Sequence, residues 1–239
     1  MGRASALLGL LAALALYDSL HERLWQTADR WDIAFIAAVL IPVSFAVVWV
    51  LLPLRNARGL LPVGAALAFL TYAFHVGGWA TPENLTKLVA VTLLGFWFLG
   101  FFEAPGWVVL VALIVPWVDA YSVWRGPTHQ IVAHHEHVFT TLSYAFPVPG
   151  ERAAANLGVP DLLFFSLFLA ASARFGLRRR ATWCLLVVSL AATIVAVYVV
   201  GRGLAALPAL SFGFLAPNLD VLWLRLRRER RAPRPQGQP

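Results

Sequence analysis

The stretch DIAFIAAVLIPVSFAVVWVLLPL, from Asp32 to Leu54, decides the class of fold. No charged residue follows Asp32 until Arg55, and the stretch is long enough to cross the hydrocarbon core of a bilayer as a helix. The whole chain has this character, because 60% of its 239 residues are hydrophobic and only 13% are charged. That charged share is about half the share in a soluble domain. A single cysteine, Cys184, excludes an internal disulfide. The composition therefore predicts a polytopic membrane protein.

Eight segments are apolar enough to be spanning helices. They cover residues 4–20, 32–54, 60–79, 85–102, 107–124, 161–175, 181–200 and 204–224. None alternates polar and apolar residues with a period of two, which favours an all-α bundle over a β-barrel. We expect one helical membrane domain over residues 1–224, with about eight (seven to nine) transmembrane helices, followed by a disordered basic tail at 225–239. The alternative for the first segment is a short signal peptide ending near Ala15, whose removal would leave seven spans.

The basic residues predict an orientation. With eight spans, one side receives Arg3, Arg55, Arg58, Arg174, Arg178, Arg179, Arg180 and the six arginines of the tail. The other side receives Arg23, Arg30, Lys87, Arg125, Arg152 and Arg202. Because cytoplasmic loops carry the excess of basic residues, both termini are predicted to be cytoplasmic and the 125–160 loop to lie outside. This topology signal explains the net charge of +7 without a nucleic-acid partner. The preference for arginine over lysine indicates a prokaryotic cytoplasmic membrane.

Two acidic residues lie in or beside predicted spans, where charged groups are rare and usually functional. Asp119 follows Pro116 in an apolar helix, although the helix could also end there and leave the acid at the interface. Asp161 opens the next span directly after Pro160, a pattern that is also ordinary at a helix N-terminus. Both acids lie near helix ends on the same side, so adjacent antiparallel helices could bring them together.

Two carboxyl groups in such a place would share one proton, because both cannot ionise cheaply in a low-dielectric site. One can then act as general base on a water molecule that attacks an amide, while the other acts as general acid. This reaction needs no metal and no other cofactor. The pair Asp119 and Asp161 therefore predicts aspartic protease chemistry.

Three segments resemble motifs of the presenilin and signal peptide peptidase family of intramembrane aspartyl proteases. DAYSVWRGP, residues 119–127, resembles the segment that begins at the first catalytic aspartate. LGVPDLLFFS, residues 157–166, resembles the Gly-x-Gly-Asp motif and the helix that follows it. Leu207-Pro208-Ala209-Leu210 matches the Pro-Ala-Leu motif that opens the last family helix. The segments occur in the family order, with one span between the second and the third, and the resemblance covers about residues 107–224.

The resemblance implies a presenilin-like fold with Asp119 and Asp161 as the catalytic dyad. Gly158 would give the backbone flexibility beside Asp161, and Pro208, Ala209 and Leu210 would shape the cleft and seat the substrate. Substrates would be transmembrane helices or signal peptides, unwound locally within the bilayer. The predicted cytoplasmic C-terminus corresponds to the signal peptide peptidase arrangement, which implies substrates with a cytoplasmic N-terminus.

The chain departs from the family at three points. Val118 stands where the family usually has tyrosine, and Pro160 stands where it usually has glycine. The family normally has nine spans, whereas eight are predicted here. A literal Tyr-Asp pair at Tyr17 and Asp18 has no family motif around it.

Two other functions use the same residues. A proton-coupled transporter could use Asp119 and Asp161 as protonation sites. A protein of the protease fold that binds membrane helices without cleaving them is the second alternative, with Pro160 as the departure that suggests it.

Histidines raise a separate question of metal binding. His129, His134, His135, Glu136 and His137 form a loop cluster whose spacing differs from the His-Glu-x-x-His zinc motif, so a solvated loop is favoured and no metal is expected. His75, inside the third span, is expected to be a packed or hydrogen-bonded histidine.

Overall fold

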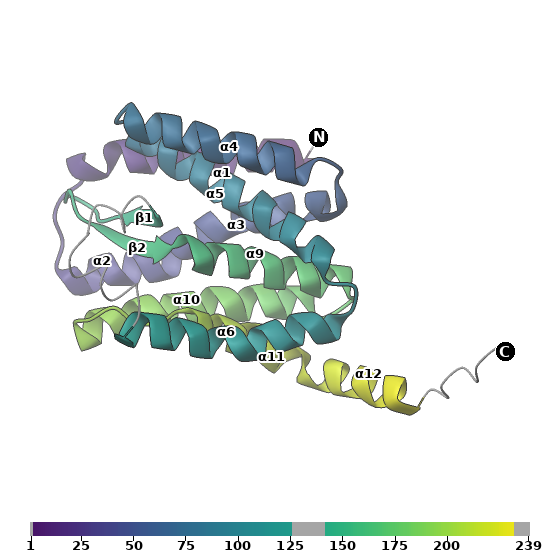
Figure 1. Cartoon of the computed structure of the whole chain (residues 1–239). Coiled ribbons are helices and arrows are strands. Elements are labelled where there is room, and N and C mark those ends of the chain that lie inside the picture. The colour runs from purple at the N-terminus through teal and green to yellow at the C-terminus, as the bar shows by residue number, and fades with distance from the viewer. Residues whose placement is uncertain (1, 126–141, 232–239) are drawn as a thin grey trace.

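The computed structural model describes residues 2–125 and 142–231, and these residues fold into a bundle of helices packed side by side (Figure 1). The expected helical character is confirmed. Among the described residues, six helical segments are long and apolar enough to cross a membrane, namely Gly2–Arg23, Asp29–Asn56, Ala80–Phe101, Pro105–Trp124, Arg179–Val200 and Leu207–Arg225. Each of the eight predicted segments falls on a helix of the bundle, but two of these helices, Leu60–Val76 and Val159–Arg174, are shorter.

Apart from the stretch between α6 and β1, the elements follow one another with short connections. The first half contains α1 (Gly2–Leu20), η1 (His21–Arg23), α2 (Asp29–Phe35), η2 (Ile36–Leu40), α3 (Ile41–Leu51), η3 (Leu52–Asn56), α4 (Leu60–Val76), α5 (Ala80–Phe98) and η4 (Leu99–Phe101). The second half contains α6 (Pro105–Arg125), β1 (Ser143–Pro147), β2 (Ala154–Gly158), α9 (Val159–Arg174), α10 (Arg179–Val200), α11 (Leu207–Leu215), η5 (Ala216–Asn218) and α12 (Leu219–Arg231).

The second span is one continuous helical segment that contains α-, π- and 3-10 helix. Element η2 is a π-helix directly before Pro42, the second residue of α3. Proline lacks the N–H that would bond to the carbonyl four residues earlier, so the chain widens locally instead of breaking. The apolar stretch that decided the fold class therefore forms one continuous span, Asp29–Asn56.

Helix α9 occupies the centre of the bundle. Its buried residues are Leu162, Phe165, Ser166, Leu167, Phe168, Leu169, Ala170, Ala171 and Ser172. The unbroken part of this run, residues 165–172, covers every face of a helix, so protein surrounds this part of α9 on all sides. The ring centroids of Phe165 and Phe45 of α3 lie 4.0 Å apart, and Phe168 stacks on Phe214 of α11 at 4.9 Å.

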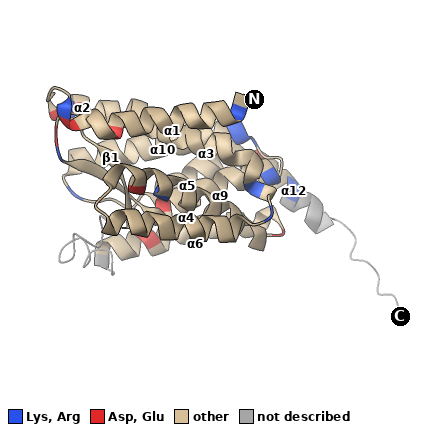
Figure 2. Cartoon of the chain, turned by 90° about the horizontal axis from the view of Figure 1, so that it is seen from above, with Lys and Arg blue, Asp and Glu red and all other residues tan. Residues whose placement is uncertain are grey.

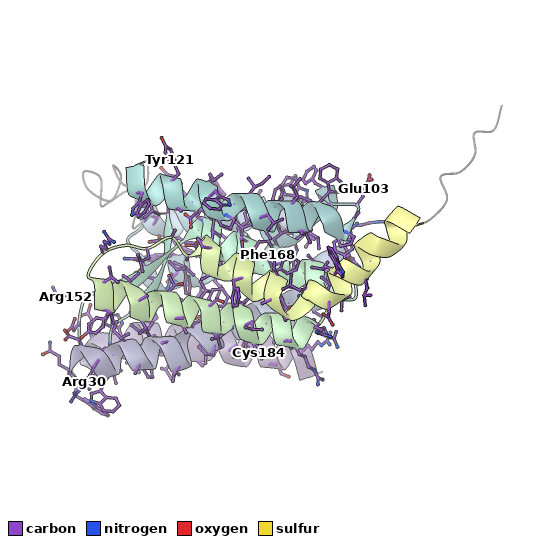
Figure 3. The ribbon with its side chains drawn as sticks, turned by 90° about the horizontal axis from the view of Figure 1, so that it is seen from below. Arg30, Glu103, Tyr121, Arg152, Phe168 and Cys184 are labelled. Atoms are coloured by element: carbon purple, nitrogen blue, oxygen red, sulfur yellow. The ribbon has the colours of Figure 1, made fainter. Side chains whose placement is uncertain are left out.

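The outer helices carry apolar side chains on their exposed faces. Helix α4 exposes Leu61, Val63 and Phe69, whereas its buried positions are Gly64 and Thr71. Helix α6 exposes residues of the same kind, and its side chains crowd the outside of the bundle in Figure 3. A continuous apolar exterior of this size would be unfavourable in water, but it is the surface that lipid chains require.

A small β-hairpin lies at one end of the bundle and was not predicted from the sequence. Strands β1 and β2 pair antiparallel, with Ser143 opposite Gly158 and Pro147 opposite Ala154. The expectation of an all-α fold therefore needs one correction, because part of the 125–160 loop is a hairpin that leads directly into α9. We call this the hairpin end.

The opposite end of the bundle is basic. Figure 2 shows Lys and Arg residues gathered where the N-terminus and α12 lie. This basic end receives arginines from the connections α3–α4 and α9–α10, as the predicted loop assignment required. Helix α12 continues to Arg231, so the first residues of the predicted disordered tail, 225–231, are helical.

Candidate active site

Asp119 lies inside α6, not at its end. The helix continues beyond it to Arg125, with Pro116 accommodated in the interior, so the alternative of a helix end at Asp119 is wrong. The neighbouring Trp117 and Val118 are exposed on the outside of the bundle. Asp119 itself is half-buried, and its Oδ2 accepts a hydrogen bond of 3.0 Å from the backbone N–H of Leu207.

Asp161 lies in the first turn of α9, at the hairpin end. Gly158 is the N-cap, and the Asp161 carboxylate reaches back to accept the Gly158 backbone N–H, as an acid at this position of a capping box does. Pro160 stands in the same first turn, where a helix has no use for the missing N–H. The proline that departs from the family pattern is therefore compatible with a regular start of α9.

The three segments singled out in the sequence meet at this end. The Asp119 and Asp161 carboxyl groups lie close enough for their charges to interact. The third segment opens α11, and its first residue supplies the N–H that holds Asp119. Leu207 and Leu210 are buried, while Pro208 and Ala209 are half-buried. The Leu207 amide was not foreseen, because a backbone donor carries no signal in residue type.

Gly158 provides space for the Asp161 carboxylate. Its φ of −58° and ψ of 142° are open to any residue. A Cβ at this position would lie 3.2 Å from Asp161 Oδ2 and 3.5 Å from Pro160 Cδ. The glycine therefore permits the close approach of the carboxylate to the backbone, which any larger residue would hinder.

Side chains from α1 and α5 hold the outer edge of β1. Asn84 pairs with Ala145 in both directions, donating from Nδ2 to the carbonyl at 2.8 Å and accepting the N–H at Oδ1 at 3.0 Å. Lys87 Nζ donates to the Ser143 carbonyl at 2.9 Å, and the Tyr17 hydroxyl donates to the Pro147 carbonyl at 2.6 Å. These three side chains, which we call the hairpin clamp, occupy the positions that a third strand would use.

An ion pair supports the clamp from α5. Lys87 is only 7% exposed and binds Glu83 Oε1 at 2.9 Å, while His75 Nδ1 lies 3.2 Å from Glu83 Oε2. Lys87 lies at the hairpin end, the side to which the orientation prediction assigns it, but it lies two turns inside α5 and not in a connection. The sequence does mark this position, because Lys87 is the single lysine of a chain rich in arginine. The prediction of a hydrogen-bonded His75 is confirmed.

Metal binding finds no support within the described residues. These hold no group of three or more His, Cys, Asp or Glu side chains suited to a metal ion. The predicted histidine loop, from His129 to His137, lies outside them.

Comparison with known proteins adds no relative. No protein-family model matches the chain, and no curated protein matches it. The residues and their geometry therefore carry the functional conclusion on their own.

Proposed function

We propose that this protein is an intramembrane aspartyl protease of the presenilin and signal peptide peptidase type. The observation that carries the proposal is the meeting of three separate segments at one place. Asp119 is bound to the first residue of Leu207-Pro208-Ala209-Leu210, and its charge acts on Asp161. Two acids from different helices, close enough for their charges to interact, are what a two-carboxylate mechanism requires.

Each carboxylate of the Asp119 and Asp161 pair accepts one backbone N–H. Asp119 Oδ2 accepts the Leu207 N–H, and Asp161 accepts the Gly158 N–H through its own carboxylate. A carboxylate has about four acceptor sites and each of these two uses one for a backbone N–H, so both keep sites for the shared proton and the attacking water. One carboxylate takes a proton from this water as it adds to the peptide carbonyl. The other carboxyl group donates its proton to the leaving amine, and the peptide bond breaks.

The two departures from the family pattern are compatible with this chemistry. Pro160 fits the first turn of α9, as described above. The Val118 side chain is exposed on the outside of α6, whereas Asp119 is half-buried, so a valine at this position is compatible with the site. The substrate in this proposal is a transmembrane helix or signal peptide, whose strand-like unwound portion must reach the hairpin end. The proposed orientation, with a cytoplasmic C-terminus, favours substrates with a cytoplasmic N-terminus.

The test is cleavage of a model transmembrane helix by the purified full chain in detergent. Asp119→Asn and Asp161→Asn each replace a carboxylate by an amide of the same shape, and each is expected to lower cleavage by at least about 10³-fold. Asp18→Asn is the matched control, because Asp18 follows Tyr17 in the literal Tyr-Asp pair but belongs to no motif. This control should cleave like the wild type.

Other outcomes would favour other functions. Binding of the helix without cleavage, unchanged in Asp119→Asn, would favour the non-cleaving binder. Proton-driven uptake into proteoliposomes that is lost in both variants, without any cleavage, would favour the transporter. Cleavage that survives both substitutions would refute the assignment of the dyad.

A further inference from the structure

A surface groove of about 590 Å³ lies at the basic end of the bundle. Its walls come from η3, the start of α4, the end of α5 with η4, and Arg174 at the end of α9. Asp161 opens the same helix α9, and a helix rises 1.5 Å per residue, so the groove lies roughly 20 Å from the proposed active site. The volume is within the usual range for small-molecule sites.

Two arginines supply hydrogen-bond donors to this groove. Arg55 Nη1 donates to the Leu52 carbonyl at 3.2 Å, and Arg174 Nη1 donates to the Leu99 carbonyl at 2.9 Å. A guanidinium carries five N–H donors, so each arginine keeps most of its donors for another partner. Arg55 Nε is buried and has no hydrogen-bond partner. Within the described part of the chain, neither arginine forms an ion pair with an acidic residue.

The start of α4 adds to the positive potential. The helix begins at Leu60, after Gly59 in the left-handed conformation with φ of 85°. Leu60 and Leu61, which line the groove, belong to the first turn, where backbone N–H groups lack intrahelical partners. The positive end of the helix dipole therefore lies at the same place as the arginines. No acidic residue lines the groove.

Apart from Asn56, the remaining side chains that line the groove are apolar. Phe96 and Trp97 of α5 and Leu60, Leu61 and Pro62 of α4 surround the polar groups. A soluble anion would leave this apolar surface uncovered, whereas an amphiphile would cover it. Trp97 is half-buried, and tryptophan is typical of the membrane interface, where headgroups and the upper parts of the acyl chains meet.

We propose that the groove binds an anionic phospholipid. The phosphate lies against Arg55, Arg174 and the start of α4, and the glycerol and upper acyl chain lie against Trp97 and Leu61. The other arginines of the basic end, such as Arg58, concentrate anionic lipid nearby without lining the groove. This site does not depend on the proposed protease function, since it lies at the other end of α9.

The experiment is native mass spectrometry of the detergent-purified full chain, titrated with phosphatidylglycerol or phosphatidylcholine. Wild type should retain phosphatidylglycerol in preference to phosphatidylcholine. Arg55→Gln and Arg174→Gln should each weaken phosphatidylglycerol binding about fivefold, the effect of one arginine near an anionic membrane surface. Glutamine at 174 keeps a donor for the Leu99 carbonyl. Arg58→Gln, an exposed arginine of the same end outside the groove, is the matched control and should bind normally.

A second variant tests the groove without removing a charge. Gly100 lines it, and a Cβ there meets nothing within 4 Å, so the ring of Gly100→Phe starts from open space and can occupy the groove. This variant should lose phosphatidylglycerol binding and keep its melting temperature. Three results would overturn the proposal: equal retention of the two lipids, a loss in Arg58→Gln as large as in the groove variants, or normal binding by Gly100→Phe. Displacement of the lipid by inorganic phosphate would also overturn it in favour of a soluble anion.

Discussion

The two aspartates of the proposed dyad lie on helices that are held in opposite ways. Helix α9, which carries Asp161, is surrounded by protein on every side over residues 165–172. Helix α6, which carries Asp119, exposes Leu113, Ile114 and Trp117 to the outside and is joined to the site by the hydrogen bond to Leu207. Asp161 is therefore positioned by the core and the hairpin, and Asp119 by the neighbouring α11. Substitutions that disturb the packing around α9 should therefore lower the free energy of unfolding far more than similar substitutions on α6.

The largest difference in stability is expected when glycine is replaced by leucine beside α9 and, for comparison, on α6. A Cβ at Gly95 of α5 would lie 2.9 Å from both the Leu163 carbonyl oxygen and Ser166 Cβ of α9. Gly95→Leu should therefore force α5 and α9 apart and lower the free energy of unfolding by about 3 kcal/mol or more. Gly106→Leu on α6, where a Cβ meets nothing within 4 Å, should change it by less than about 0.5 kcal/mol. Unfolding in mixed micelles measures both, and equal effects would contradict the comparison.

The second prediction concerns the support of the hairpin that leads into α9. Lys87→Met removes the donor to the Ser143 carbonyl and leaves Glu83 with His75 alone, inside a buried region. The free energy of unfolding should fall by about 2 to 3 kcal/mol, because one partner of a buried ion pair is lost. The control is Arg152→Gln, which removes an exposed pair with Glu22 at 3.8 Å and should cost less than about 0.5 kcal/mol.

A double variant sharpens this prediction. Adding Glu83→Gln to Lys87→Met removes the unpaired charge and should recover part of the lost stability. If the double variant is as unstable as the sum of the two single variants, the ion pair is not what supports the clamp.

The third prediction concerns Gly158, beside the Asp161 carboxylate, and its expected effect is smaller. Gly158→Ala places a methyl group 3.2 Å from Asp161 Oδ2, which should displace the carboxylate by a few tenths of an ångström. Cleavage, expressed as kcat, should fall about tenfold, because misplacement of a catalytic group raises the barrier. The melting temperature should not fall, since alanine adopts this backbone conformation without strain. A large loss of stability would show that the glycine is needed for its backbone conformation instead.

The smallest effect at neutral pH is expected from one hydroxyl group. Tyr144 of β1 is buried, and its hydroxyl lies 3.1 Å from Ser44 Oγ of α3. Tyr144→Phe should lower the free energy of unfolding by about 1 kcal/mol, the contribution of one hydrogen bond.

The same tyrosine predicts a pH dependence. Burial raises the pKa of Tyr144 from 10.0 to about 12, and the Ser44 hydrogen bond opposes this shift. The Tyr144 hydroxyl ionises near pH 10 in the unfolded chain and near pH 12 in the folded chain. The stabilisation is therefore complete below pH 10 and is lost as the pH rises through 12. Between these values wild type should lose up to about 2 to 3 kcal/mol more than Tyr144→Phe. Parallel pH profiles of the two proteins would show that the phenol is not buried.

Much of the architecture could be predicted from local sequence. The apolar runs separated by arginine clusters predicted where each helix lies, because a segment in lipid must satisfy its own backbone hydrogen bonds and only a helix does so. The candidate aspartates could also be found, because an acid in an apolar run is conspicuous. The hairpin could not, since β1 and β2 are short and gain their stability from Asn84, Lys87 and Tyr17, which lie far away in the chain.

The helical membrane class, the two acids and the basic character of one set of loops follow from the residues alone. The packing of distant segments is what places the Leu207 amide on Asp119, gives the Asp161 carboxylate room at Gly158, and brings Arg55 and Arg174 to one groove. The physical reason is the range of the forces involved. Hydropathy acts on each segment alone and is recorded in composition, whereas a hydrogen bond or a close approach exists only after distant segments have packed together.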